Sequence, residues 1–151
     1  MSKANFKIGE LAKRVGVSVE SIRFYESEGL MAAKSRTASG YRIYGESELQ
    51  QLYFIVHAKR IGFSLKEIRR LLGLQIDKES HTCEEVKGYT GSKIAEVDAK
   101  IADLMRMRAA LSNLYDACCG GSESAENCTI LQTLEDPHHF EVKNKQQSIE
   151  R

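Results

Sequence analysis

Residues 6–26 read FKIGELAKRVGVSVESIRFYE, and they carry the strongest indication of the fold. Apolar residues recur at helical spacing as far as Val15, where Gly16 ends the first predicted helix. Ser18 is a suitable N-cap for a second helix, whose apolar residues continue at helical spacing to Tyr25. Two short helices joined by a tight turn that contains glycine predict a helix-turn-helix, although an ordinary helical hairpin has the same pattern.

The second predicted helix carries polar side chains that suit a DNA-binding role. A helix-turn-helix places its second helix in the major groove, where polar side chains reach bases and phosphates. On this basis we expect DNA contacts from Ser18, Glu20, Ser21 and Arg23.

Residues 36–44, RTASGYRIY, place a Ser-Gly turn among aromatic and basic residues. This pattern predicts a β-hairpin that forms a wing beside the helix-turn-helix. Phosphate contacts supply most of the affinity of a DNA-binding protein and fix its register on the duplex. We expect Arg36, Tyr41 and Arg42 to make such contacts.

A second pair of helices follows the predicted wing. Apolar residues recur at helical spacing over residues 49–56, and Ser64 begins a capping box ahead of another apolar helix. Gly62 separates the two helices. Lys59 and Arg60 stand just before this glycine, where they either reach the DNA backbone or form a solvated basic face.

Charge is divided unevenly between the two halves of the chain. Residues 1–75 hold 13 lysines and arginines against 7 aspartates and glutamates, whereas residues 76–151 hold 9 against 14. The first half is therefore the candidate for binding nucleic acid. No apolar run approaches the roughly 18 residues of a membrane-spanning helix, and residues 1–6 lack the apolar core of a signal peptide, so we expect a cytoplasmic protein without a membrane partner.

Four cysteines bracket a long helix-forming stretch, with Cys83 at its start, Cys118 and Cys119 at its end, and Cys128 in the loop beyond. Thiols stay reduced in the cytoplasm, so metal ligands or sensors are expected rather than disulfides. A continuous helix at 1.5 Å rise per residue would keep Cys83 roughly 50 Å from Cys118. A second copy running antiparallel would bring these cysteines together, which predicts a homodimer with two symmetric metal sites.

The predicted long helix carries apolar residues with alternating gaps of three and four, as in a heptad seam. The seam consists of Ile94, Val97, Ile101, Leu104, Arg108, Leu111 and Tyr115. An antiparallel pair that joins the cysteines would cross near Ile101 and place Val97 opposite Leu104. Burial of the seam against the chain's own N-terminal module is the alternative, but so long a helix has little else to cover it. We therefore expect an antiparallel coiled coil.

Residues 118–128, CCGGSESAENC, form a loop rich in glycine and serine that is able to wrap a metal ion. Thiolates bind soft and borderline ions, and zinc usually takes four tetrahedral ligands. The thiolates would serve one divalent metal ion, or two if one of them bridges, and their charge favours zinc, cadmium, lead or mercury over copper(I). The candidate ligands are Cys118, Cys119, Cys128, Glu123 and the Cys83 of a second copy.

Four motifs have the order and spacing of a known family, namely residues 8–12 (IGELA), 22–26 (IRFYE), 40–44 (GYRIY) and 61–65 (IGFSL). On these motifs nearly the whole chain resembles the MerR family of transcriptional regulators. The resemblance implies a mainly α fold, in which a winged helix-turn-helix DNA-binding domain is followed by a long antiparallel coiled-coil dimerisation helix. It also implies a homodimeric activator that distorts promoter DNA for RNA polymerase when its effector binds. The DNA contacts implied by the family are Arg23, Tyr25, Arg36, Tyr41 and Arg42.

The segments around the cysteines, residues 81–85, 116–120 and 128–131, resemble those of zinc-responsive members of this family. The resemblance implies two zinc ions per site and control of a zinc efflux promoter. Those members carry a histidine ligand in the loop, whereas this sequence carries Glu123. Glutamate ligates zinc through oxygen, so the preference among zinc, cadmium and lead stays open.

We expect four segments along the chain. They are a DNA-binding domain over residues 1–75, a linker and dimerisation helix over 76–118, a metal-binding loop with a short helix over 119–136, and a disordered tail over 137–151.

A thiol redox sensor on the same DNA-binding frame is the main alternative, although adjacent Cys118 and Cys119 would make a strained disulfide. No acid–base pair or activated nucleophile stands at a recognisable spacing, which argues against an enzyme. The sequence leaves open whether His81 supports the metal site or caps the long helix, and it assigns no firm role to His138 or His139.

Overall fold

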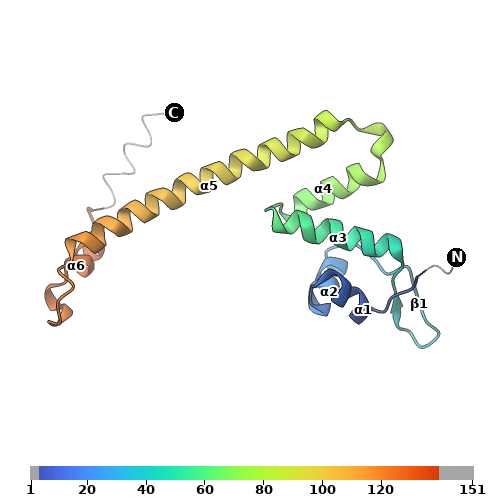
Figure 1. The fold of residues 1–151 in the computed structure, drawn as a ribbon, viewed down its shortest axis with the longest axis horizontal. Coiled ribbons are helices and arrows are strands. Elements are labelled where there is room, and N and C mark those ends of the chain that lie inside the picture. The colour runs from blue at the N-terminus through green and yellow to red at the C-terminus, as the bar shows by residue number, and fades with distance from the viewer. Residues whose placement is uncertain (1–3, 140–151) are drawn as a thin grey trace. The chain divides into compact units, whose positions relative to one another are not determined.

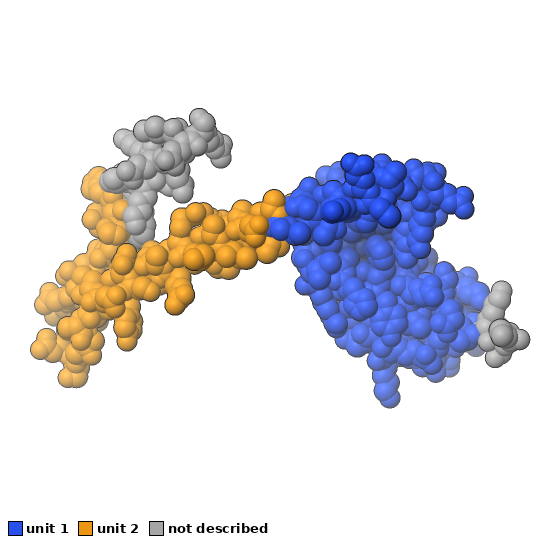
Figure 2. Space-filling view, turned by 45° about the horizontal axis from the view of Figure 1, so that its top comes forward, with its two compact units in different colours: residues 1–94 blue, residues 95–151 orange. Residues whose placement is uncertain are grey.

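The computed structural model describes residues 4–139. It divides the chain into two compact units, Met1–Ile94 and Ala95–Arg151, which are coloured separately in Figure 2. The predicted domain boundaries at residues 75, 118 and 136 stay predictions. Of the predicted tail, residues 137–139 form a turn, and the rest lies outside the described residues.

The described part of the first unit combines helices with one small β-hairpin (Figure 1). Helix α1 packs on α2 and α3, and α3 packs on α4. The order of the elements confirms the predicted winged helix-turn-helix in a mainly α fold. The elements are α1 (Ile8–Val15), α2 (Val19–Ser27), β1 (Ser35–Arg36), β2 (Arg42–Ile43), α3 (Glu46–Arg60), α4 (Leu65–Ile76) and the 3-10 turn η1 (Lys78–Ser80).

The turn between α1 and α2 follows the sequence chemistry that predicted it. Gly16 has φ +77°, a left-handed conformation that side chains with a Cβ rarely adopt, and its N–H donates to the carbonyl of Ala12. The hydroxyl of Ser18 accepts a hydrogen bond from the backbone N–H of Ser21 at 3.1 Å. These two residues therefore end one helix and begin the next within a few positions.

Helices α1, α3 and α4 begin with the same contact, in which a glutamate carboxylate accepts a hydrogen bond from the backbone N–H three residues earlier. Such a carboxylate satisfies an otherwise unpaired N–H and interacts favourably with the helix dipole. The pairs are Glu10 with Lys7 in α1, at 3.0 Å, Glu48 with Gly45 in α3, at 2.7 Å, and Glu67 with Ser64 in α4, at 2.7 Å.

The hydrophobic core lies among helices α1, α2, α3 and α4, and each of them contributes side chains to it. Burial of each large aliphatic side chain contributes roughly 1.5–3 kcal/mol relative to exposure. Tyr44, which follows the wing, is also fully enclosed. The largest side chains that are completely buried are Leu11, Ile22, Tyr44, Leu52, Ile55 and Ile68.

The wing is an antiparallel pair of two-residue strands. Its register pairs Ser35 with Ile43 and Arg36 with Arg42. Directly after β2, the backbone of Tyr44 exchanges two hydrogen bonds with Phe6, at 2.7 and 2.9 Å. The wing is thus attached to the segment that leads into α1.

Helix α5 is continuous from Cys83 to Ala117, a length of 35 residues. The predicted seam runs along it, and most of its apolar side chains are exposed in the single chain, such as Leu104 at 63% and Leu111 at 65%. Exposed apolar side chains in heptad spacing are typical of a helix that forms a coiled coil.

The second unit ends in the 3-10 turn η2 (Ala125–Asn127) and the short helix α6 (Thr129–Glu135). Cys128 is the N-cap residue of α6, so the loop after α5 returns to a helix at the last cysteine. Among residues 4–139, no helix has the length and apolar character needed to cross a membrane.

Candidate nucleic-acid interface and metal centre

The predicted DNA-binding residues of the first unit fall into two groups. A surface depression of about 550 Å³ between α2 and the wing is lined by Arg23, Arg36 and Arg42, together with the carboxylate of Glu26. Three arginines against one glutamate make this depression electropositive, which suits a phosphate chain. The structure thus brings together three of the predicted contacts from separate parts of the sequence.

The remaining candidates lie outside this depression. Ser18, Glu20 and Ser21 follow the turn into α2, where the Ser18 hydroxyl already accepts the N–H of Ser21. Lys59 is exposed near the end of α3. Ser18, Glu20 and Lys59 are exposed and Ser21 is half-buried. None of the four lines the depression with the arginines.

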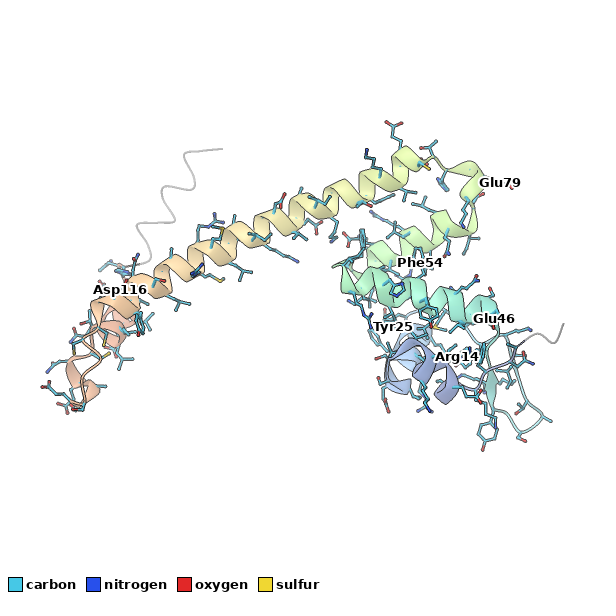
Figure 3. The ribbon with its side chains drawn as sticks, viewed as in Figure 1. Arg14, Tyr25, Glu46, Phe54, Glu79 and Asp116 are labelled. Carbon is cyan, nitrogen blue, oxygen red and sulfur yellow. The ribbon has the colours of Figure 1, made fainter. Side chains whose placement is uncertain are left out.

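Two aromatic candidates differ in their surroundings. Tyr41 stands at the wing with 66% of its surface exposed, and the ammonium of Lys7 lies 5.9 Å from the centre of its ring. Tyr25, labelled in Figure 3, packs part of its ring against the hydrophobic core. Tyr41 is therefore free to reach a ligand along its whole side chain, whereas Tyr25 has only its outer part available.

Glu26 is a residue that the charge pattern did not predict for this surface. One oxygen of its carboxylate accepts a hydrogen bond from the hydroxyl of Tyr44, and the other oxygen lies 3.3 Å from Nε of Arg42. Burial, followed by the hydrogen bond to Glu26, raises the pKa of Tyr44 above its usual value. Glu26 is distant in sequence from Arg42 and Tyr44, so the sequence gives no direct sign of these contacts. The only signal for Glu26 is its place in the motif of residues 22–26.

The start of α5 carries Cys83, which is exposed. The preceding turn is a capping box, because Thr82 accepts the N–H of Glu85 at 3.2 Å and donates its own N–H to that carboxylate at 2.9 Å. Nδ1 of His81 also lies 3.2 Å from the Glu85 carboxylate. The backbone of Thr82 and then His81 hold the pKa of Glu85 below its usual value. His81 thus supports the helix start at which Cys83 stands.

The end of α5 brings two thiols together. Cys118 directly follows the helix, and its thiol interacts with that of Cys128 at the start of α6. The amides of Leu131 and Ile130, with a smaller contribution from Cys118, hold the pKa of the Cys128 thiol below its usual value. A thiol with a lowered pKa becomes a thiolate more readily, and the thiolate is the form that binds metal.

The other two predicted ligands of the loop are more exposed than Cys118 and Cys128. Cys119 is exposed, and its sulfur would stand 3.7 Å from a Cβ added at Gly121. Glu123 is exposed as well. Within residues 4–139, no three cysteine, histidine, aspartate or glutamate side chains gather closely enough to hold a metal ion. The donor set fits a soft or borderline metal, but one chain provides an incomplete site.

Two family models match overlapping parts of this chain. The model described as MerR HTH family regulatory protein matches residues 6–74, and the one described as MerR, DNA binding, matches residues 49–114. The regulator ZntR of Escherichia coli K12 is 48% identical over 130 residues, which cover 86% of this chain and 92% of ZntR. The chain belongs to the MerR family. It is a DNA-binding regulator of transcription and not an enzyme.

Solved structures of MerR regulators share this fold. The lead(II) complex of PbrR691 from Ralstonia metallidurans CH34 has a TM-score of 0.74 at 36% identity, and the match covers 85% of this chain and 98% of PbrR691. HiNmlR, a MerR family regulator bound to promoter DNA, has a TM-score of 0.54 at 28% identity, with 75% of this chain and 85% of that chain covered. The family resemblance expected from the four motifs is thereby confirmed.

Proposed function

We propose that this MerR regulator is a cytoplasmic homodimer that senses a divalent metal ion and activates a metal-resistance promoter, zinc efflux being the foremost candidate. The observation that carries this proposal is the distribution of thiols along α5. Cys83 begins the helix, and the paired thiols of Cys118 and Cys128 follow its end. A helix of 35 residues is about 52 Å long, so a second, antiparallel copy is needed to unite them.

The exposed seam of α5 supplies the surface for this second copy. Apolar side chains in heptad spacing gain stability when they are covered by a partner helix. A pair that crosses near Ile101 would bring Cys83 of each chain to the thiols of the other. The proposed ligands are Cys118, Cys119, Cys128, Glu123 and the Cys83 of the second chain.

A metal ion held by several thiolates would supply positive charge and a fixed coordination geometry between the two chains. The identity of the ion is the finer part of the proposal. ZntR, the mercuric resistance regulators and the lead complex of PbrR691 belong to the same family, and their names span zinc, mercury and lead. We favour zinc, with two ions per site, and keep cadmium and lead as alternatives because Glu123 is a hard oxygen donor in a thiolate set.

On the DNA side, we propose that the electropositive depression binds the phosphate backbone while α2 enters the major groove. The proposed DNA contacts from α2 and its N-cap are Ser18, Glu20, Ser21, Arg23 and the exposed part of Tyr25. Arg36, Tyr41 and Arg42 would contact it from the wing, and Lys59 from α3. Distortion of promoter DNA in the metal-bound state would then allow RNA polymerase to start transcription.

The metal is tested by titrating the reduced, purified dimer with zinc, cadmium, lead and copper(I) and counting bound ions by native mass spectrometry. Transcription from the cognate promoter is measured at each saturation. Two zinc ions per site with zinc-dependent transcription would support the favoured assignment. One ion per site, with cadmium or lead as the stronger activator, would replace it. Transcription that is equal with and without every one of these metals would refute metal sensing.

The role of Glu123 is tested with a matched pair of variants. Glu123→Gln and Glu126→Gln each remove one carboxylate from the same loop, and both residues are exposed. If Glu123 is a ligand, only the first variant loses metal affinity, and Glu123→His raises the preference for zinc. Equal effects of the two glutamine variants would mean that the loop contributes charge alone.

Cys83→Ser separates metal sensing from the thiol redox alternative. Cys83 lies at the far end of α5 from the paired thiols, so its loss removes the ligand from the second chain without changing Cys118 or Cys128. We expect this variant to lose the metal response. A variant that keeps a full response to oxidant while wild type shows none to metal would favour the redox sensor.

A further inference from the structure

One carboxylate in the first unit links α2 to the wing. Oε2 of Glu26 lies 3.3 Å from Nε of Arg42, and Oε1 accepts the hydroxyl of Tyr44. The Glu26 side chain is only 12% exposed, whereas that of Arg42 is 40% exposed. Because Tyr44 is fully buried, this carboxylate has a fixed position, and the arginine that it contacts reaches toward solvent.

The Glu26 carboxylate also reduces the repulsion between two arginines of the wing. The register places Arg36 directly opposite Arg42, and like charges in directly opposed positions destabilise an antiparallel pair. Nη1 of Arg36 donates to the carbonyl of Gly40 within the hairpin, at 3.4 Å, a contact that adds no negative charge. Glu26 is the carboxylate that lines the same depression as both arginines. It therefore offsets part of their mutual repulsion.

The contact also determines which part of Arg42 is available. A guanidinium has one donor at Nε and four more on its two terminal nitrogens. Glu26 takes the Nε side, which leaves the terminal nitrogens for a phosphate group. A guanidinium held on one side loses less freedom when it binds on the other.

We infer that Glu26 is a positioning residue for DNA binding, which acts by fixing the guanidinium of Arg42 for a phosphate contact. The inference rests on the proposed DNA interface. It adds Glu26 to that interface, although a carboxylate cannot itself bind a phosphate group. Glu26 strengthens binding through Arg42, although its own charge repels DNA.

The two roles of Glu26 predict opposite changes in DNA affinity when its carboxylate is removed. If Glu26 were only a nearby negative charge, its removal would strengthen DNA binding. If it positions Arg42, its removal weakens binding. In Glu26→Gln the amide oxygen still accepts from Tyr44, but the amide N–H groups then face the Nε donor of Arg42 and displace it.

The experiment uses the full chain and a duplex enriched by the wild-type protein from a random-sequence pool, with binding measured by fluorescence anisotropy across a salt series. We expect Glu26→Gln to bind about fivefold to tenfold more weakly, with the slope of log affinity against log salt reduced by about 1, as for one lost phosphate contact. Glu28→Gln is the matched control, because Glu28 is exposed at the C-cap of the same helix. It should bind as well as wild type or slightly better.

A double-mutant cycle shows whether Glu26 acts through Arg42. In an Arg42→Ala background, Glu26→Gln should cause no further weakening. Equal weakening in both backgrounds, or binding by Glu26→Gln that is as tight as wild type, would overturn the inference. If the wild-type protein enriches no duplex, the proposed DNA-binding function fails, and this outcome is distinct from a failure of the inference about Glu26.

A measurement on the wild-type chain covers the case in which Glu26→Gln does not fold. In nitrogen-15 spectra of the free protein, the Nε–H signal of Arg42 should be protected from exchange at neutral pH because it is bonded to Glu26. Arg36, whose contact with Gly40 uses Nη1, is the internal reference. An Arg42 signal that exchanges as fast as that of Arg36 would show that the contact does not hold the guanidinium.

Discussion

Lys93 of α5 and Glu67 of α4 form an ion pair, with Nζ 2.9 Å from Oε2. Lys93 is 8% exposed and is the only charged residue classed as buried within residues 4–139. The same carboxylate oxygen accepts the backbone N–H of Ser64, which begins α4. The Lys93 ammonium also lies 5.6 Å from the ring centre of Phe63. One carboxylate thus serves both as the cap of α4 and as the attachment point of α5.

This ion pair predicts a specific acid sensitivity. The hydrogen bond from Lys93, followed by that from the Ser64 backbone, lowers the pKa of Glu67 from 4.5 to about 2. A carboxylate with a lowered pKa in the folded state stabilises the protein above its unfolded pKa, and this contribution is lost as the pH falls from 4.5 toward 2. Urea denaturation at several pH values should show Glu67→Gln to be less stable than wild type at pH 7, with the difference shrinking in that window.

Glu48→Gln is the control for this prediction. Glu48 caps α3 with the same geometry but has no cation partner within 4.0 Å among the described residues. Its loss should therefore weaken the helix start by about 0.5–2 kcal/mol, as for other N-terminal caps. If the two glutamine variants respond identically to acid, the ion pair with Lys93 has no special role.

Removal of the Tyr44 hydroxyl should destabilise the first unit. Tyr44→Phe keeps the buried ring but takes away the donor that Glu26 accepts, which should cost about 1–2 kcal/mol in the free energy of unfolding. Burial raises the pKa of Tyr44, so its contribution is present below pH 10 and is lost as the pH rises above 10. Tyr41→Phe, at an exposed ring, should change the stability little in the same urea titration.

A charge at the centre of the seam should prevent dimerisation. Ile101→Glu places two carboxylates beside each other in the proposed antiparallel pair, so we expect a monomer in sedimentation velocity experiments at micromolar concentration. Ala99→Glu adds the same charge roughly 160° around the helix and should leave the dimer intact. A dimeric Ile101→Glu chain would place the interface elsewhere.

Removal of the metal should uncouple DNA binding from transcription. After chelation, we expect the affinity for the promoter to remain within about threefold of the metal-bound value, because the proposed DNA contacts lie in the first unit and the thiols of Cys118 and Cys128 in the second. Transcription should fall to the level without protein or below it. A chelated protein that leaves the DNA altogether would instead indicate regulation by release.

The sequence predicted the features that depend on local chemistry. Gly16 and Ser18 marked the turn between α1 and α2, the capping box at Ser64 marked the start of α4, and the bracketing cysteines coincide with the ends of α5. The turn and capping signals each depend on residues within a few positions of each other, whereas the cysteines mark the two ends of one helix of 35 residues. The family assignment followed from four such local motifs in the right order.

Long-range pairs of polar residues were not predictable in the same way. Glu26 contacts Arg42 and Tyr44, which lie 16 and 18 positions away, and Lys93 pairs with Glu67 across 26 positions. No periodicity links such positions, and a lysine in a polar helix is ordinarily expected to be exposed. The predicted DNA contacts and metal ligands remain predictions, because they depend on partners other than this chain.

The capping glutamates change the meaning of the charge count for the first half of the chain. Of the seven carboxylates in residues 1–75, Glu10, Glu48 and Glu67 accept backbone N–H groups at helix starts, and Glu26 contacts an arginine. Four of the seven negative charges are thus held in fixed positions by local partners, three at helix starts and one at the wing. The formal excess of six is therefore not spread evenly over the unit: a phosphate that approaches the depression meets three arginines and one carboxylate that is already bonded.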